Sequence, residues 1–374
     1  MLNWIKKGPI PKYHQCRMLI EQDIRNGKYR LGSALPSELR LAEDYGISRQ
    51  TLRRALQSLE NEGYLIRQQG RGTFVAKVCG NYRSGPLNLG LVIYKPALEA
   101  QWYFPDLLRG ISDVVTADAA NIIIIPFDED TPGVQEGSFC RQMIERKKLQ
   151  GLLIAGEELQ ESEMFHLLAV GFPFAMIRLL PYRDGMIDYV CYDHISGIKQ
   201  AVSYLYKLGH RHIAYIGGRY SRYYAAMCMM MAFREAMTEL NLALKKGWIV
   251  ECDYAGEMAF RLAERLLSAA EMPTAIVLAD DLFAQSVYEA AAAKCLRIPD
   301  DLSVTGFNDL PVASVLSPAL TTIRVPRYEI GRLACQVLGE KIRGLAEDYC
   351  RELEVELVLR DSCAPCRKRE STGR

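Results

Sequence analysis

The chain has 374 residues, of which 49% are hydrophobic and 24% are charged. That length suits two or three domains, and the composition excludes a disordered chain because it can form hydrophobic cores. Residues 1–77 hold 14 Lys and Arg against 7 Asp and Glu, a net charge of +7, which leaves −6 for the rest within the overall +1. A basic N-terminal segment on an acidic body suggests that only this segment binds a polyanion.

The eleven cysteines are scattered and odd in number, which is typical of reduced thiols. Cys363 and Cys366 form a CxxC pair without the second pair that a zinc site needs, so we expect no metal and no cofactor. The N-terminus lacks the apolar stretch of a signal peptide, and runs such as 122–125 are far shorter than the ~20 residues that span a bilayer. These features predict a cytoplasmic protein without a membrane segment.

Residues 1–78 are predicted to form an α+β domain that begins with two helices. Apolar residues recur at spacings of three and four from Tyr13 to Ile24, which predicts a first helix. Ser37 is suited to cap a short second helix that ends at Tyr45.

A third helix and a hairpin follow. Ser48 is suited to cap this helix, and Gly63 ends it. The spacing i, i+3, i+4, i+7 defines its buried stripe, which is Leu52, Ala55, Leu56 and Leu59. Two strands are expected at residues 65–67 and 73–75. This layout is that of a winged helix-turn-helix, which places a helix in the major groove of double-stranded DNA.

The open face of the third helix carries side chains suited to DNA. Arg49 and Arg53 are four residues apart, and an arginine can donate two hydrogen bonds to guanine, while Gln50 can pair with adenine. The helix N-terminus is suited to phosphate. The predicted DNA-binding residues are Ser37, Ser48, Arg49, Gln50, Thr51 and Arg53, with Gln69, Gly70, Arg71 and Gly72 in the hairpin turn. The alternative is a solvated basic helix, which the agreement of caps, turn, stripe and hairpin disfavours.

Residues 10–77 resemble the GntR-type winged-helix family. The resemblance rests on Leu35-Pro36-Ser37-Glu38, on Ser48 to Leu56, on Leu59 to Gly63 and on Gly70-Arg71-Gly72-Thr73-Phe74-Val75. It implies DNA contacts from Ser48, Arg49, Gln50, Arg53, Gln69 and Gly70. Leu39 departs from the polar residue that is frequent at its position, so no contact is expected there.

A polar, turn-rich break at residues 79–87 is interpreted as a linker, and residues 362–374 as a polar tail. Between them, apolar runs alternate with helical patterns such as 106–117 and 195–208. The runs that predict strands are residues 89–94, 122–127, 151–155, 174–177, 213–217, 275–279 and 302–306. Apolar strands separated by helices over about 270 residues predict an α/β domain of two doubly wound parallel-sheet subdomains.

Ligands of such sheets bind beyond the carboxyl ends of the strands. Tyr94, Asp281 and Asn308 follow strands, and such polar side chains suit the hydroxyls of a sugar. Trp102 and Phe104 are suited to stack on a sugar face. The neighbours Asp280 and Asp281 can also be interpreted as a catalytic pair, although no nucleophile motif accompanies them.

Residues 88–361 resemble the LacI-type regulatory domain, which is similar to periplasmic sugar-binding proteins. The resemblance rests on Tyr192-Asp193, on Leu208 to Gly218, on Pro273 to Ile276, on Ala279-Asp280-Asp281, on Ile298 to Asp309 and on Leu316 to Thr322. It implies a homodimer with an effector in the cleft between the subdomains. The candidate effector-binding residues are Tyr94, Trp102, Phe104, Arg178, Asp193, Met229, Asp281 and Asn308.

Several of these positions depart from the pattern that the resemblance implies. Met229 stands where arginine is expected, Arg178 where aspartate is frequent, and Asn308 where aspartate contacts a sugar. Such a pocket need not bind the usual sugar. The alternatives are that Met229 is plain helix core and that Arg178 is a surface residue. His210 is expected to be structural and not a metal ligand.

Taken together, the sequence predicts a sequence-specific DNA-binding transcription regulator, a repressor controlled by a small-molecule effector. The effector is expected to be a sugar or sugar derivative, and the partner a palindromic operator in double-stranded DNA. The alternative is an enzyme that acts on a sugar-like substrate and carries a DNA-binding appendage.

Overall fold

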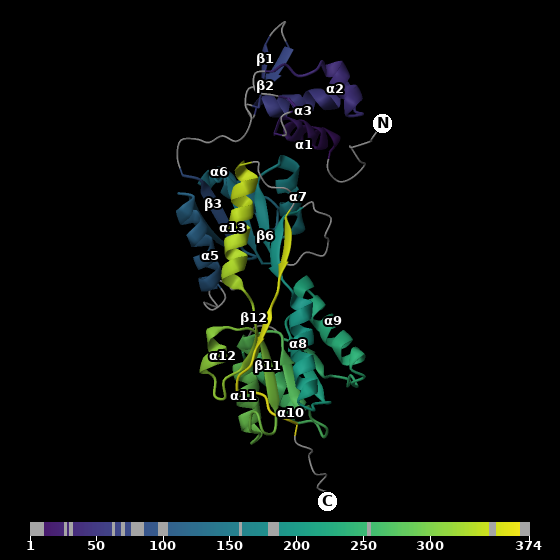
Figure 1. Cartoon of the computed structure of the whole chain (residues 1–374), viewed down its shortest axis with the longest axis vertical. Helices are drawn as coiled ribbons and strands as arrows, with labels where there is room; N and C mark the ends of the chain where they lie inside the picture. The colour runs from purple at the N-terminus through teal and green to yellow at the C-terminus, as the bar shows by residue number, and fades with distance from the viewer. Residues whose placement is uncertain are drawn as a thin grey trace, which may run out of the picture.

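The computed structural model describes residues 11–25, 28–29, 33–61, 64–68, 72–75, 86–95, 104–156, 159–178, 187–252, 256–343 and 349–366. The elements form three bodies that follow one another along the longest axis of the molecule (Figure 1). We name them the head (residues 11–75), the N-lobe, which contains the sheet of β3, and the C-lobe, which contains the sheet of β8.

The head is a winged helix-turn-helix, as predicted. Its elements are α1 (Lys12–Arg25), α2 (Glu38–Asp44), α3 (Arg49–Asn61), β1 (Leu65–Gln68) and β2 (Gly72–Val75). The strands pair antiparallel, with Leu65 opposite Val75. The predicted stripe of α3 is buried, with no residue above 3% exposure, and packs against Cys16, Ile20 and Ile24 of α1. Burial of this stripe fixes which face of α3 remains open to a partner.

Within the described residues, the N-lobe is built on a parallel six-stranded sheet in the order β13-β7-β6-β5-β3-β4. Its strands are β3 (Asn88–Tyr94), β4 (Asn121–Phe127), β5 (Gly151–Ala155), β6 (Phe174–Ile177), β7 (Tyr189–Tyr192) and β13 (Cys350–Leu353). Its helices are α5 (Phe104–Ala117), α6 (Phe139–Lys147), α7 (Glu161–Val170) and α13 (Arg327–Arg343). Leu91 and Val92, neighbours in β3, belong to different hydrophobic clusters, so both faces of the sheet are covered.

The C-lobe repeats this architecture in the order β14-β12-β11-β10-β8-β9, with β14 antiparallel to β12. Its strands are β8 (Ile213–Gly217), β9 (Ile249–Glu251), β10 (Ala275–Leu278), β11 (Ser303–Asn308), β12 (Thr321–Arg324) and β14 (Glu356–Val358). Its helices are α8 (His194–Lys207), α9 (Tyr224–Glu239), α10 (Gly256–Leu267), the 3₁₀ turn η1 (Asp281–Phe283), α11 (Ala284–Ala293) and α12 (Pro311–Val315).

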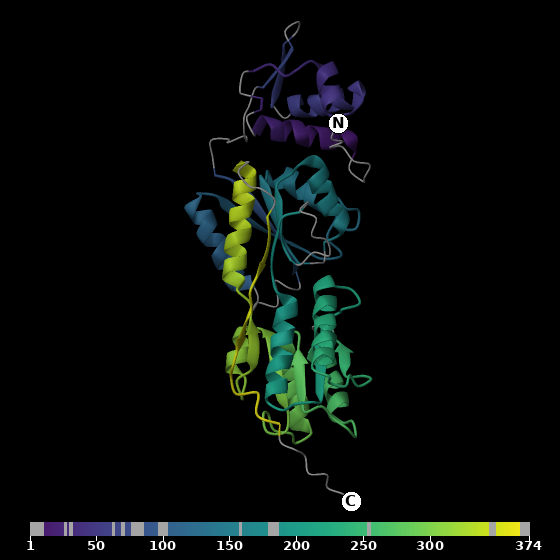
Figure 2. The same cartoon turned by 45° about the vertical axis from the view of Figure 1, so that its right-hand side comes forward.

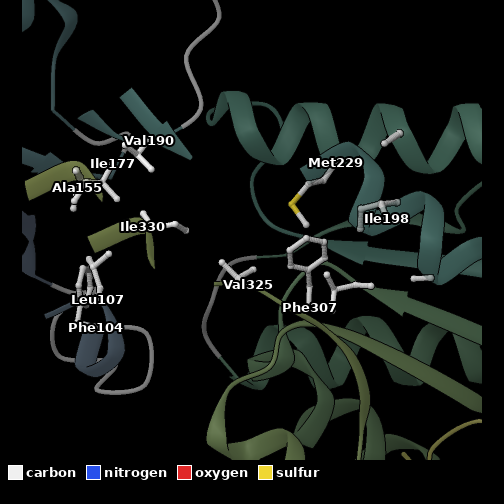
Figure 3. Packing of buried hydrophobic residues seen from close by; sticks show 14 of the residues in the cluster. Phe104, Leu107, Ala155, Ile177, Val190, Ile198, Met229, Phe307, Val325 and Ile330 are labelled. Carbon is white, nitrogen blue, oxygen red and sulfur yellow. The ribbon is translucent and has the colours of Figure 1, made fainter. Parts of the chain in front are cut away.

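The lobes are not successive halves of the chain. The chain crosses between them after β7, after β12 and after β13, so α13 and β13 return to the N-lobe late in the sequence. One hydrophobic cluster contains buried residues of both lobes. Figure 3 shows Val325, at the second crossing, between Ile330 and Val190 on one side and Phe307 on the other. The lobes therefore share core packing at their junction.

The C-terminal boundary of the body differs from the prediction. Ser362 is fully buried, and its hydroxyl donates to the carbonyl of Val304 and accepts from the amide of Thr321. The amide of Cys366 donates to the carbonyl of Leu208. Residues 362–366 are thus packed on the C-lobe and are not a polar tail, because the last strand leads them across the end of the sheet. No helix in the described ranges combines the length and apolar character needed to cross a membrane.

Candidate DNA interface and effector cleft

The N-terminal ends of α2 and α3 are capped as predicted. The hydroxyl oxygen of Ser37 accepts a hydrogen bond from the amide of Arg40 at 3.3 Å. That of Ser48 accepts from the amide of Thr51 at 3.2 Å and lies 2.8 Å from the hydroxyl of the same residue. Each cap satisfies an amide that the helix leaves free and fixes where the helix begins.

The open face of α3 is exposed and basic. Arg49, Gln50 and Arg53 are all exposed. Nε of Arg53 donates to Glu38 Oε2 at 2.7 Å, and Nη2 of Arg67 donates to Glu38 Oε1 at 2.6 Å. Glu38 at the start of α2 thus holds one arginine from α3 and one from β1. The sequence prediction missed both Glu38 and Arg67, although Glu38 lies inside the Leu-Pro-Ser-Glu motif.

The hairpin turn is only partly covered by the structure. Gln69, Gly70 and Arg71 lie outside the described residues. Gly72 is exposed, with φ +115°, a conformation that favours glycine, and a Cβ added there would meet nothing within 4 Å. Leu39, where no contact was expected, is 48% exposed.

In the N-lobe, Tyr94 contributes to a contact between the lobes. Its hydroxyl donates to Glu129 Oε1 at 2.6 Å, and Nη2 of Arg222, from the C-lobe, lies 3.6 Å from the same oxygen. The hydrogen bond from Tyr94, together with Arg222, lowers the pKa of Glu129. Arg178 is half-buried, and its Nη1 lies 3.4 Å from the carbonyl of Gly156. Trp102 lies outside the described residues.

On the C-lobe side, Asp280 and Asn308 are joined. Nδ2 of Asn308 donates to Asp280 Oδ2 at 2.8 Å, and burial raises the pKa of Asp280 to about 7. Asn308 and Asp309 both have positive φ, at 100° and 51°, where non-glycine residues are strained. The guanidinium of Arg327 donates to both of their carbonyls and lies 3.4 Å from Asp106 of α5. Arg327 therefore ties the strained end of β11 to the N-lobe.

Asp281 corrects the sequence prediction of an effector contact. Its side chain is fully buried, Oδ2 accepts from the amide of Leu310 at 2.7 Å, and Oδ1 accepts from Thr322 Oγ1 at 2.6 Å. Burial raises its pKa to about 8. Because η1 begins directly after β10, the neighbouring aspartates point to opposite sides, and Asp281 is structural.

Three further predicted effector residues have structural contacts. Met229 and Phe104 are each 6% exposed in the shared cluster, where Met229 lies beside Phe307 (Figure 3). The burial of Met229 agrees with the alternative interpretation, in which this residue is part of the helix core. Asp193 caps α8, since its Oδ1 accepts from the amide of Ser196 at 2.8 Å. Of the predicted effector residues that the structure describes, only Asp193 lines the ≈ 700 Å³ groove that runs along α8 beside Glu352 and Leu357.

His210 has a structural position, as expected. It is buried, with Nδ1 3.0 Å from Thr274 Oγ1 and Nε2 3.0 Å from Ser303 Oγ and 3.1 Å from the carbonyl of Ala364. Burial lowers its pKa, which favours the neutral ring. Among the described residues, no group of three His, Cys, Asp or Glu side chains is placed to hold a metal ion.

Comparison with known proteins matches both parts of the molecule. Residues 12–75 match the model for bacterial regulatory proteins of the gntR family, and residues 202–363 match the periplasmic binding protein-like domain. The arabinose metabolism transcriptional repressor of Geobacillus stearothermophilus is 27% identical over 375 residues, covering 96% of this chain and 99% of the relative.

Other relatives share the body alone. The ribose operon repressor of Haemophilus influenzae is 29% identical over 262 residues, 70% of this chain and 77% of the relative. A crystal structure of a putative transcriptional regulator LacI from Bacillus cereus matches 75% of this chain and all of that chain, with 25% identity and a TM-score of 0.68. These relatives are named as regulators and not as enzymes. The chain thus joins a winged-helix domain that matches the gntR family of bacterial regulatory proteins to a body that matches the periplasmic binding protein-like domain and LacI-type regulators.

Proposed function

We propose that this protein is a sequence-specific DNA-binding repressor that acts as a homodimer on a palindromic operator and is controlled by a carbohydrate effector bound between the lobes. The observation that carries the proposal is the exposed face of α3. The caps and the buried stripe of α3 fix its position in the head, so Arg49, Gln50 and Arg53 are exposed to solvent. The hydrogen bond to Glu38 holds Arg53 in one orientation. Arginines oriented in this way can read guanine edges in the major groove.

The residues between the lobes support a hydroxyl-rich effector. Tyr94 and Glu129 from the N-lobe and Asp280 and Asn308 from the C-lobe offer both donors and acceptors. Oδ1 of Asn308 is buried without a hydrogen-bond partner among the described residues, and a ligand hydroxyl can satisfy such an acceptor. The relatives named as an arabinose metabolism transcriptional repressor and a ribose operon repressor support the same ligand class.

The DNA part is tested with the full chain. Duplexes selected from a random pool are titrated against scrambled duplexes at several salt concentrations. We expect selection of an inverted repeat and a steep fall of log K with log salt. Arg49→Ala or Arg53→Ala should cost about 1–3 kcal/mol of discrimination if the residue contacts a base. Arg261→Ala, which removes an exposed cation of the C-lobe, is the matched control. Equal affinity for selected and scrambled duplexes would refute the proposal.

The effector part is tested by thermal shift with sugars, sugar acids and phosphosugars. A true effector at 100 times its Kd should add about 2.7 kcal/mol to the free energy of unfolding. Asn308→Ala should remove the response, and Gln285→Ala, an exposed change on α11, should leave it intact. Stabilisation by anionic sugars alone would make Arg178 the partner of the anion. If no carbohydrate stabilises the chain, the effector class is wrong.

A further inference from the structure

Arg17 of α1 is an unusual side chain for a DNA-binding head. It belongs to α1 and not to the exposed face of α3, and it is only 4% exposed, although arginine is rarely buried in so small a domain. In both views of the molecule α1 lies on the side of the head that faces the N-lobe (Figures 1 and 2). Part of the surface that buries Arg17 lies outside the head.

That surface is the C-terminal turn of α7. Gly171 ends this helix in the left-handed conformation, with φ +66°, and its amide donates to the carbonyl of Leu168. A Cβ added at Gly171 would lie 2.5 Å from Nη1 of Arg17, so the guanidinium lies directly against the glycine. Glycine at this position thus serves two needs, because it permits the helix end and leaves room for the arginine.

The charge of Arg17 is compensated from both sides of the contact. Within the head, Nη1 lies 3.5 Å from Glu21 Oε2, and the other oxygen of Glu21 accepts from the hydroxyl of Tyr64 at 2.9 Å. From the N-lobe, the C-terminus of α7 presents the negative end of its dipole. A buried cation is tolerated only with such partners. The C-terminus of α7 is one of them, and it is available to Arg17 only while the head contacts the body.

We propose that the C-terminal turn of α7 is a docking site for the chain's own DNA-binding head, with Arg17 as its anchor. Docking leaves Arg49 and Arg53 exposed, so the docked head remains able to bind DNA. The contact limits how the head is oriented on the body before DNA is met. It therefore reduces the ordering that operator binding has to impose.

Helix α7 also contacts one of the predicted effector residues. Sδ of Met164, in the middle of this helix, lies 3.6 Å from Nη2 of Arg178. One helix thus touches a predicted effector residue and ends at the head. This link between the effector and the docking site rests on the proposed function, whereas the docking itself does not.

The experiment is small-angle X-ray scattering of the full chain without DNA. Arg17→Gln removes the charge and keeps much of the length of the side chain. Gly171→Asn keeps a residue that tolerates the left-handed conformation and adds a side chain where the guanidinium lies. Lys12→Gln makes the same charge change at an exposed position of α1 and is the matched control. Circular dichroism checks that each variant is folded.

We expect the parent and Lys12→Gln to scatter as the docked arrangement, and Arg17→Gln and Gly171→Asn to show a larger radius of gyration and maximum dimension. Operator affinity should fall roughly tenfold in both variants, since each head must then be ordered during binding. An unchanged radius of gyration in a folded variant at either position overturns the proposal, as does a parent that scatters as an extended chain. Because the scattering needs no DNA, failure of operator binding alone would refute the proposed function and not the docking.

Discussion

Glu38 accepts hydrogen bonds from arginines of two different elements of the head. It holds Arg53 of α3 at 2.7 Å and Arg67 of β1 at 2.6 Å. Both arginine side chains are at least 48% exposed, so these ion pairs contribute little to the free energy of unfolding, about 0–1 kcal/mol. Their effect is on geometry, because they fix the direction of each guanidinium before DNA binds.

We predict that Glu38→Gln lowers the ratio of operator affinity to random-sequence affinity. The arginines lose their orientation, which weakens base readout, while loss of a negative charge near phosphate strengthens non-specific binding. The measurement is titration of operator and random duplexes at two salt concentrations. Glu43→Gln, an exposed change of the same charge on α2, is the control. Equal effects of the two substitutions would show that Glu38 acts only through its charge.

The buried carboxyls of the C-lobe predict a pH dependence of stability. Burial raises the pKa of Asp281 to about 8 and that of Asp280 to about 7. A carboxyl of the unfolded chain titrates near pH ~3.9, so the folded chain binds more protons between about pH 4 and pH 8. The contribution of these groups to the free energy of unfolding is therefore full below about pH 4 and is lost as the pH rises towards 8.

We predict that Asp281→Asn flattens this loss. An asparagine can accept from the amide of Leu310 and donate to Thr322 Oγ1, as the protonated acid would. Denaturant unfolding at several pH values between about 5 and 8 measures the slope. Asp361→Asn, at an exposed position, should keep the parent slope. A slope in Asp281→Asn as steep as that of the parent would contradict a protonated Asp281.

At the residue scale, the sequence indicates which residue types lie at a strand end, but it does not determine which way each side chain points. Asp280 and Asp281 are adjacent at the end of one strand, and the sequence alone favoured Asp281 as the effector contact. Only the turn η1 decides which carboxyl is buried under β12 and which meets Asn308. Met229 is a similar case, because the sequence alone does not decide whether an apolar residue of α9 faces the neighbouring lobe or the core.

At the scale of elements, Ser48 caps α3 and is also a proposed DNA contact. Substitutions at this position distinguish its role in stability from its role in DNA binding. We expect Ser48→Ala to cost about 1 kcal/mol in the free energy of unfolding of the head, because the amide of Thr51 loses its acceptor. Ser48→Asp should keep the cap and favour the helix N-terminus, while its charge repels phosphate and weakens DNA binding.

The measurements are thermal unfolding and titration of operator DNA. Ser48→Asn is the matched control, since asparagine caps as well as aspartate and carries no charge. Operator affinity that is equal in the aspartate and asparagine variants would show that no phosphate lies near this helix end.

The elements that the sequence predicted are those whose own residues determine them. The stripe of α3 and long apolar runs such as 151–155 need no partner to be recognised. The strands missed were β7, β9, β12, β13 and β14, each of three or four residues. Such short segments become strands by pairing with a neighbour, and that neighbour is known only from the fold.

At the scale of the whole molecule, the head and the body differ in charge and in how the chain runs through them. The basic head, with a net charge of +7 over residues 1–77, stands at one end of a body with a net charge of −6. The body is held together by three crossings and by the shared cluster around Val325. The effector proposed to bind between the lobes would therefore act on a junction whose two sides share core residues, so its binding could change the shape of the body.

The sequence by itself determined that a GntR-type winged helix precedes a two-lobed α/β body, because caps, glycine turns and apolar periodicity are local properties of the chain. It also identified the exposed face of α3. Only the tertiary structure decided that Glu38 joins Arg53 to Arg67, that Asp281 is buried, that residues 362–366 belong to the C-lobe, and that Arg17 meets Gly171. Most of these contacts join residues that are distant in sequence, and the burial of Asp281 depends on which way the chain turns at the end of a strand. A local sequence pattern contains no information about either.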